Sequence, residues 1–205
     1  MKSLLSTLML TLGATAVAHA EPRLPVISPD QYTTEQKQAA EEFLSARKTA
    51  VFGPFEPLMH SPQLMSQTRA MGDYLRYKSA IGNTLSEFVI LITAREWTQD
   101  YEWHVHYPIA LKAGIKQEVA DAIADGRRPA NMSEDEQIVY DFSIELHRNK
   151  RVSDATYNRV QQRFGNQGVV DLTGINAYYT LLAMQMNTAE YPLPKEAKKL
   201  PRFPE

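Results

Sequence analysis

Residues 85–97 read LSEFVILITAREW, an apolar run that carries the acidic residue Glu87 near its start. Placed on a helix, the run is apolar on nearly every side, which is the pattern of a helix buried all round. A carboxylate in such surroundings must be paired or protonated, because an unpaired buried charge is too costly. The run therefore predicts a buried central helix, and His106, Arg76 and Arg95 are the candidate partners for Glu87.

The segments around this run are helical in pattern as well. Thr33 with Gln36, and Ser133 with Glu136, match the capping box that opens a helix. No stretch shows the period-2 alternation of a strand with strand-like flanks. The expected class is all-α, with further helices over 33–48, 61–79, 100–113, 116–125, 133–148, 153–164 and 169–186.

The first twenty residues resemble a secretory signal peptide. Lys2 precedes an apolar run over 4–17, and Ala18-His19-Ala20 matches the small-x-small cleavage rule. We therefore expect residues 1–20 to be removed on export, which would place the protein in the periplasm without a membrane anchor. Residues 21–205 suit one domain, with proline-rich arms at both ends.

Composition excludes several classes of function. The formal net charge is −2 and no basic stripe is visible, so nucleic acid is not an expected partner. The chain contains no cysteine. It can therefore form no disulfide, and it has neither a thiol nucleophile nor a thiolate metal site.

The residues that carry chemistry gather on the segment after the central run. On a helix over 99–110, one face collects an amide, an acid, an indole, an imidazole and a small residue, namely Gln99, Glu102, Trp103, His106 and Ala110. Glu102 and His106 are four residues apart, so their side chains can meet. This face is typical of a pocket wall. A purely structural ion pair, or a core histidine with satisfied hydrogen bonds, explains the same residues.

Several motifs resemble the carboxymuconolactone decarboxylase family, which has the alkylhydroperoxidase-D-like fold. The core motifs are Leu85-x-Glu87, Tyr101-Glu102-Trp103-x-x-His106 and Ala110-x-x-x-Gly114. The resemblance extends over most of the mature chain, through Gly53-Pro54, His60-Ser61-Pro62, Phe164-Gly165 and Tyr178-Tyr179. It implies a helical bundle that assembles as a homo-trimer or homo-hexamer.

The chain departs from the peroxidase branch of this fold at two positions. In that branch, two cysteines lie upstream of the helix histidine, and a glutamate on the preceding helix completes a proton relay. Aligned on Glu87 and His106, Gln99 and Glu102 stand at the cysteine positions. The redox centre is therefore absent, while the acid–base groups remain.

The resemblance implies a decarboxylase- or lyase-like enzyme that acts on a small carboxylate or lactone without a cofactor. His106 would move the proton, since imidazole titrates near neutral pH, and Glu87 and Glu102 would orient or tune it. The expected substrate-binding residues are Trp103, Gln99, Arg76 and Arg95, because arginine can hold a carboxylate through two hydrogen bonds.

Two other functions compete with this interpretation. A non-catalytic module that binds a small molecule would keep the same pocket. A metal site is disfavoured, because His104 and His106 point about 200° apart on a helix. Glu102 with His106 supplies only two ligands, which is too few for a catalytic metal. We therefore expect no metal.

Overall fold

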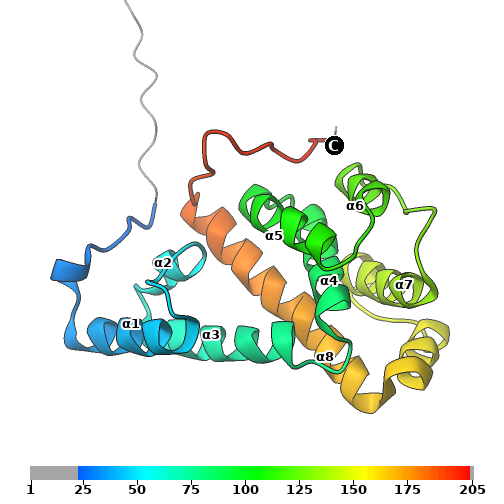
Figure 1. Ribbon diagram of the computed structural model, residues 1–205, viewed down its shortest axis with the longest axis horizontal. Coiled ribbons are helices and arrows are strands. Elements are labelled where there is room, and N and C mark those ends of the chain that lie inside the picture. Colours follow the sequence, from blue (N-terminus) through cyan, green and yellow to red (C-terminus); the bar gives the residue numbers. More distant parts are fainter. Residues whose placement is uncertain (1–22, 204–205) are drawn as a thin grey trace, which may run out of the picture.

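The computed structural model describes residues 23–203 (Figure 1). The expected signal peptide, residues 1–20, and the expected mature start at Glu21 lie outside this range. A 3-10 turn, Pro29–Gln31, comes first. The helices of this part of the chain are α1 (Thr34–Arg47), α2 (Phe55–Leu58), α3 (Pro62–Tyr77), α4 (Asn83–Glu96), α5 (Asp100–Lys112), α6 (Gln117–Ala124), α7 (Glu134–Asn149) and α8 (Asp154–Ala189).

Residues 23–203 contain no strand, which confirms the all-α class. Both predicted capping boxes are present. The Gln36 backbone amide donates to Thr33 Oγ1 (3.3 Å), and the Thr33 amide donates to the Gln36 side chain (2.9 Å). Ser133 and Glu136 exchange the equivalent bonds. These local bonds explain why the starts of α1 and α7 are correctly predicted.

Three details differ from the sequence prediction. The predicted helix over 100–113 begins with Asp100, a residue type that favours the N-cap, but Gln99 caps α5: its side-chain oxygen accepts from the Tyr101 amide (2.7 Å). A short helix, α2, forms between the predicted helices over 33–48 and 61–79, where none was predicted. The two last predicted helices run on as α8, and the expected break survives as a left-handed backbone at Gly165 (φ 70°), a conformation that glycine adopts without strain.

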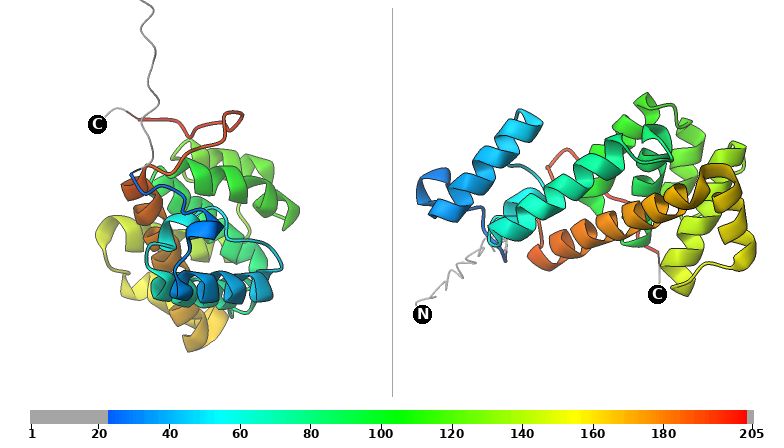
Figure 2. Two further views of the ribbon diagram at one scale, coloured as in Figure 1. Left: turned by 90° about the vertical axis from the view of Figure 1, so that its left-hand side faces the viewer. Right: turned by 90° about the horizontal axis from the view of Figure 1, so that it is seen from below.

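Helix α4 forms the centre of the molecule, as its apolar sequence predicts. It packs against α5, α7, α8 and α6. Its residues Phe88, Val89, Ile90 and Leu91 are completely buried. Helices α1 and α3 pack together at one end of the molecule and α6 and α7 lie at the other, while α3 and α8 run side by side (Figures 1 and 2).

The segment after α8, residues 191–203, is the C-terminal arm. It has no helix or strand, and it crosses the end of α5 toward α6 (Figure 1). Leu200 is only 3 % exposed, so the arm is packed onto the domain. Within residues 23–203, no helix has the length and apolar character that crossing a membrane requires.

Candidate active site

Four ionisable side chains from three helices meet in the interior. Arg76 at the end of α3 donates to Glu87 Oε1 of α4 through Nη2 (2.8 Å) and Nε (3.2 Å). The other oxygen of Glu87 lies 2.7 Å from His106 Nδ1 on α5. His106 Nε2 lies 3.3 Å from Glu102 Oε2, one helical turn earlier on α5. We call these four residues the tetrad.

Burial alone would raise the pKa of Glu87, because water no longer solvates the carboxylate. The hydrogen bond and charge of His106, together with those of Arg76, overcome this and lower the pKa. Glu87 is therefore a carboxylate at neutral pH, although its side chain is fully buried. As an ionised acceptor it accepts a hydrogen bond from His106 Nδ1–H, and the other ring nitrogen, Nε2, faces Glu102.

The pKa of Glu102 is shifted in the opposite direction to that of Glu87. Burial raises the pKa of its carboxyl, and the nearby charge of Glu87 raises it further, against the opposing charges of His106 and Arg76. One of its oxygens, Oε1, is buried without a hydrogen-bond partner within the described residues. A neutral carboxylic acid tolerates this site better than a carboxylate. Of the two glutamates, Glu102 is therefore the one that binds a proton more readily, and its Oε2 lies beside His106 Nε2.

The surroundings separate the two glutamates of the tetrad. Arg76 is positive and Glu87 negative, and His106 lies between Glu87 and Glu102, a carboxyl whose pKa is raised. Pushing the pKa values of two carboxyl groups apart is how acid and base roles are divided in enzyme sites. Perturbed carboxyl groups of this kind cluster at functional sites.

Two tyrosines of α8 complete the surroundings of the tetrad. The Tyr179 ring contacts the His106 ring edge to face, with centroids 5.3 Å apart, and Tyr178 packs against Tyr179 in the same way at 5.0 Å. Burial raises the pKa of both hydroxyls, so both stay protonated as potential donors. A side chain at Gly72 of α3 would collide with the Tyr178 hydroxyl, so glycine permits this close approach of α3 and α8.

Neither tyrosine was a candidate site residue in the sequence analysis. Tyr178-Tyr179 entered only through the family resemblance, because α8 is far from α5 in the chain. A pair of aromatic residues in an apolar helix gives no local sign that it faces a polar cluster.

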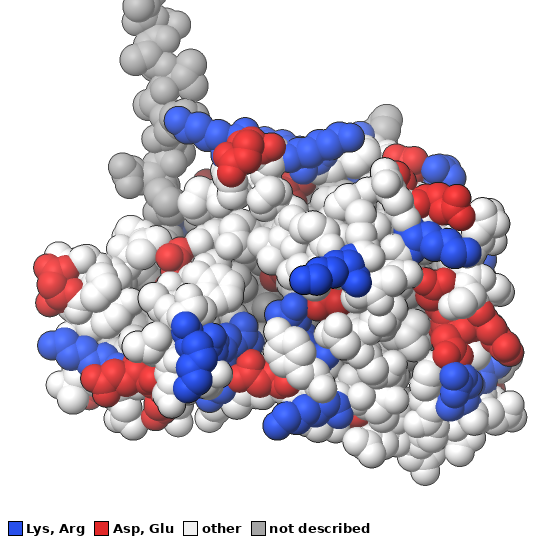
Figure 3. Space-filling view, viewed as in Figure 1, with Lys and Arg blue, Asp and Glu red and all other residues white. Residues whose placement is uncertain are grey.

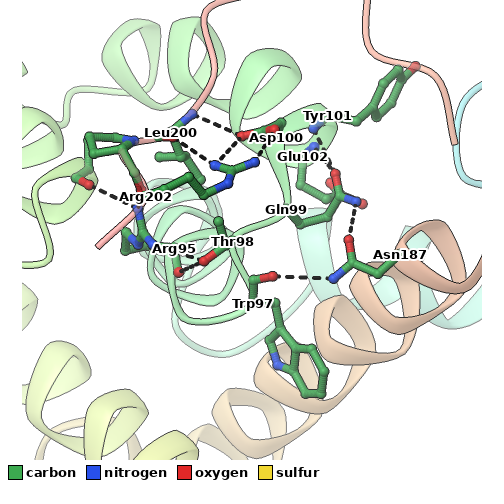
Figure 4. A network of polar contacts seen from close by, with 12 residues as sticks. Arg95, Trp97, Thr98, Gln99, Asp100, Tyr101, Glu102, Asn187, Leu200 and Arg202 are labelled. Carbon is green, nitrogen blue, oxygen red and sulfur yellow. Dashed lines mark hydrogen bonds and ion pairs between the residues drawn. The ribbon is translucent and has the colours of Figure 1, made fainter. Parts of the chain in front are cut away.

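The side chains of the remaining predicted site residues, Gln99, Arg95 and Trp103, have other partners. The Gln99 side chain caps α5 and donates to Asn187 (2.9 Å), as Figure 4 shows. Arg95 donates to the Pro201 carbonyl of the C-terminal arm (2.7 Å). Trp103 packs on Tyr107 and lines a cavity between α5, α6 and the arm. The structure therefore brings Arg76, and not Arg95, to Glu87.

The described residues contain no cluster of metal ligands, and the face in Figure 3 carries charges of both signs. Within 23–203, no three histidine or acidic side chains are grouped to hold a metal. On the face in Figure 3, acidic and basic side chains are interspersed, without a continuous stripe of one sign.

Two solved structures share this architecture. One is a crystal structure of an alkylhydroperoxidase AhpD core, an uncharacterized peroxidase-related protein from Ralstonia eutropha JMP134. It is 21% identical with a TM-score of 0.70, and the match covers 87% of this chain and 95% of that chain. The other is an uncharacterized peroxidase-related protein from Silicibacter sp. TM1040, 11% identical with a TM-score of 0.70, covering 90% and 97%. No family model and no curated protein sequence matches the chain. At these identities the likeness establishes the fold alone: the chain has the alkylhydroperoxidase-D-like fold.

Proposed function

We propose that this protein is a cofactor-independent acid–base enzyme of the decarboxylase or lyase type that acts on a small carboxylate or lactone. The observation that carries the proposal is the tetrad, in which Glu102, with a raised pKa and an unpartnered oxygen, faces His106, and His106 is oriented by the ionised Glu87. The sequence resemblance to carboxymuconolactone decarboxylases supplies the reaction type.

The groups suit the proton balance of a decarboxylation. When the bond to the carboxylate breaks, carbon dioxide leaves and the electron pair passes into the conjugated carbonyl of the substrate. The resulting enolate carbon needs one proton, which the pair of Glu102 and His106 holds. Positioned proton transfer of this kind contributes roughly 100- to 10,000-fold in rate.

Arg76 has the most exposed side chain of the tetrad. The side chains of Glu87, Glu102 and His106 are at most 7 % exposed, whereas the Arg76 side chain is 14 % exposed. Arg76 uses Nε and Nη2 on Glu87, which leaves its Nη1 for a substrate carboxylate. Because the other three groups are nearly closed off, substrate binding requires neighbouring side chains to move aside.

The proposal is tested with a panel of small unsaturated carboxylates and lactones, followed by ultraviolet absorbance and carbon dioxide release over a range of pH. Turnover of a panel member with a pH-dependent rate supports the enzyme. Saturable binding without turnover supports the alternative, a non-catalytic binding module.

Glu102→Gln should raise stability and lower activity together. The folded carboxyl has a raised pKa, so the folded state binds more protons than the unfolded state above the unfolded pKa of about 4.3. Stability therefore falls as pH rises from that value toward the folded pKa. The amide removes this cost, and we expect the free energy of unfolding at pH 7 to rise by on the order of 1 kcal/mol.

The same variant loses the transferable proton, so kcat should fall by at least about a hundredfold. Denaturant unfolding and initial rates measure the two effects. Glu118→Gln, at an exposed position of α6, is the control and should change neither. A Glu102→Gln protein that is both less stable and fully active would contradict the assignment.

The protein should show no thiol-dependent peroxidase activity, in spite of its fold. The thiolate is the nucleophile in that chemistry, and the chain has no cysteine. Consumption of an organic hydroperoxide is measured with metal-free protein and a dithiol reductant. A rate above the protein-free background would overturn this prediction.

We further propose a homo-trimer or homo-hexamer, as the family resemblance implies. Exposed apolar side chains on α8 and α3 support it: Val170, Leu181 and Met184, and Met71 and Tyr74, are each at least 37 % exposed. Unpartnered apolar surface of this kind is typical of subunit contacts.

A further inference from the structure

A cavity of about 560 Å³ lies beside α5 and is lined by none of the four tetrad residues. Its walls come from α5, α6 and the C-terminal arm. At 100° per residue, the stripe of α5 that lines it is turned by about 150° from the stripe that carries Glu102 and His106. The volume is in the range of small-molecule sites, roughly 300–1,000 Å³. We call it the α5–α6 cavity.

Two aromatic rings form one wall of the α5–α6 cavity. Trp103 and Tyr107 lie one turn apart on α5, with ring centroids 5.6 Å apart and planes tilted by 36°. Pro108 and Leu200 extend this apolar surface. Such a wall suits a flat ring or a conjugated chain, which aromatic side chains contact in offset or edge-to-face geometry.

The charges around the cavity favour an anion. Lys198 and Lys199 of the arm line it, and within residues 23–203 neither has an ion-pair partner. Asp125 pairs with Arg127 (2.8 Å), whereas Asp121 accepts from the neutral Tyr107 hydroxyl (2.7 Å) and keeps its charge. The three cations Lys198, Lys199 and Arg127 thus exceed the two carboxylates by one positive charge, which favours an entering anion.

We propose that the α5–α6 cavity is a second ligand site, which binds a small planar carboxylate with its ring on Trp103 and Tyr107 and its carboxylate at Lys198 and Lys199. A lysine ammonium binds such a group as a point charge. The site is separate from the tetrad and does not depend on the proposed function.

Binding at this site would fasten the C-terminal arm to the start of α5. The residues after the two lysines already hold that start, as Figure 4 shows. Arg202 Nη2 lies 2.6 Å from Asp100 Oδ2, and the Leu200 amide donates to Asp100 Oδ1 (2.9 Å). A ligand that contacts both the lysines and α5 adds a further contact between the arm and the helix. It should therefore also raise the melting temperature of the protein.

The test uses benzoate as the probe and Trp103 fluorescence as the signal. The chain has two tryptophans, so the Trp97→Phe variant makes the signal specific. Benzoate should give a saturable fluorescence change, and its affinity should fall as salt is added, because salt screens the charges. In Lys198→Gln/Lys199→Gln the Kd should rise by about tenfold, typical of losing a charge-assisted hydrogen bond.

Two control variants locate the binding. Lys195→Gln, in the same arm but outside the cavity lining, should bind benzoate as the parent does. His106→Gln should also bind it unchanged, because no tetrad residue lines the cavity. Circular dichroism and the melting temperature establish that each variant is folded.

The proposal is overturned if benzoate does not saturate the signal, or if the double lysine variant binds as tightly as the parent. Loss of binding in His106→Gln would also overturn it, since that places benzoate at the tetrad. Failure of the proposed decarboxylase activity leaves each of these outcomes unaffected.

Discussion

His106→Gln is expected to lower kcat by at least about a hundredfold for any panel substrate that the protein turns over. Glutamine keeps much of the volume of the imidazole and can still donate to Glu87, where Nδ1 now lies 2.7 Å away. It cannot carry a proton between Glu102 and a substrate at neutral pH. The melting temperature should fall only modestly, because Glu87 keeps its ion pair with Arg76.

Initial rates and thermal unfolding are measured on the same preparations. His60→Gln is the matched control. His60 lies in the segment between α2 and α3 and is exposed, and its Nε2 lies 3.0 Å from the Pro25 carbonyl oxygen. That variant should keep full activity. A His106→Gln protein that is as active as the parent, or inactive only because it unfolds, would leave the tetrad a structural ion-pair cluster.

Glu87→Gln is expected to lower the free energy of unfolding by about 3 kcal/mol, the loss typical of removing one member of a buried ion pair. The Arg76 guanidinium, which is mostly buried, would lose its carboxylate partner. Glu96→Gln is the control: Glu96 pairs with Arg148 at 2.7 Å, but the Arg148 side chain is 52 % exposed. That pair should contribute less than about 1 kcal/mol.

Denaturant unfolding at several pH values measures the difference. Because the pKa of Glu87 is lowered in the folded protein, its contribution is fully present above the unfolded pKa of about 4.3. It is lost as the pH falls through the folded pKa. The difference in the free energy of unfolding between the parent and Glu87→Gln should therefore become smaller at acidic pH.

A double variant separates the pair from other effects of the substitution. Arg76→Met/Glu87→Gln should lose less stability than the sum of the single variants, because neither charge is then left without the other. If Glu87→Gln lowers the free energy of unfolding no more than Glu96→Gln does, the ion pair between Arg76 and Glu87 does not stabilise the fold. The charges assigned to these two residues are then wrong.

The features predicted correctly from sequence are those with local causes. The capping boxes of α1 and α7 involve residues three apart, so the chain forms them without help from the rest of the fold. The buried character of α4 follows from its apolar composition. The meeting of Glu102 and His106 follows from four-residue spacing on one helix.

The choice of partner for Glu87 was left open by the sequence, and the tertiary structure decided it. Arg95 is on the same helix, but eight residues along α4 correspond to about 12 Å of helix axis. Its guanidinium is held instead by the Pro201 carbonyl and the Phe203 ring of the C-terminal arm. Arg76 reaches Glu87 because the turn between α3 and α4 folds its helix end back beside α4.

The sequence by itself determined the helical class, the starts of α1 and α7 and the acid–base residue types. Only the tertiary structure decided their chemical states. The pKa of Glu87 is lowered and that of Glu102 is raised, because one has Arg76 and His106 as hydrogen-bond partners, while the other has an oxygen buried without one. Burial and partners come from helices far apart in the chain, and the pKa of a carboxyl depends on both. No local pattern in residues 85–106 carries that information.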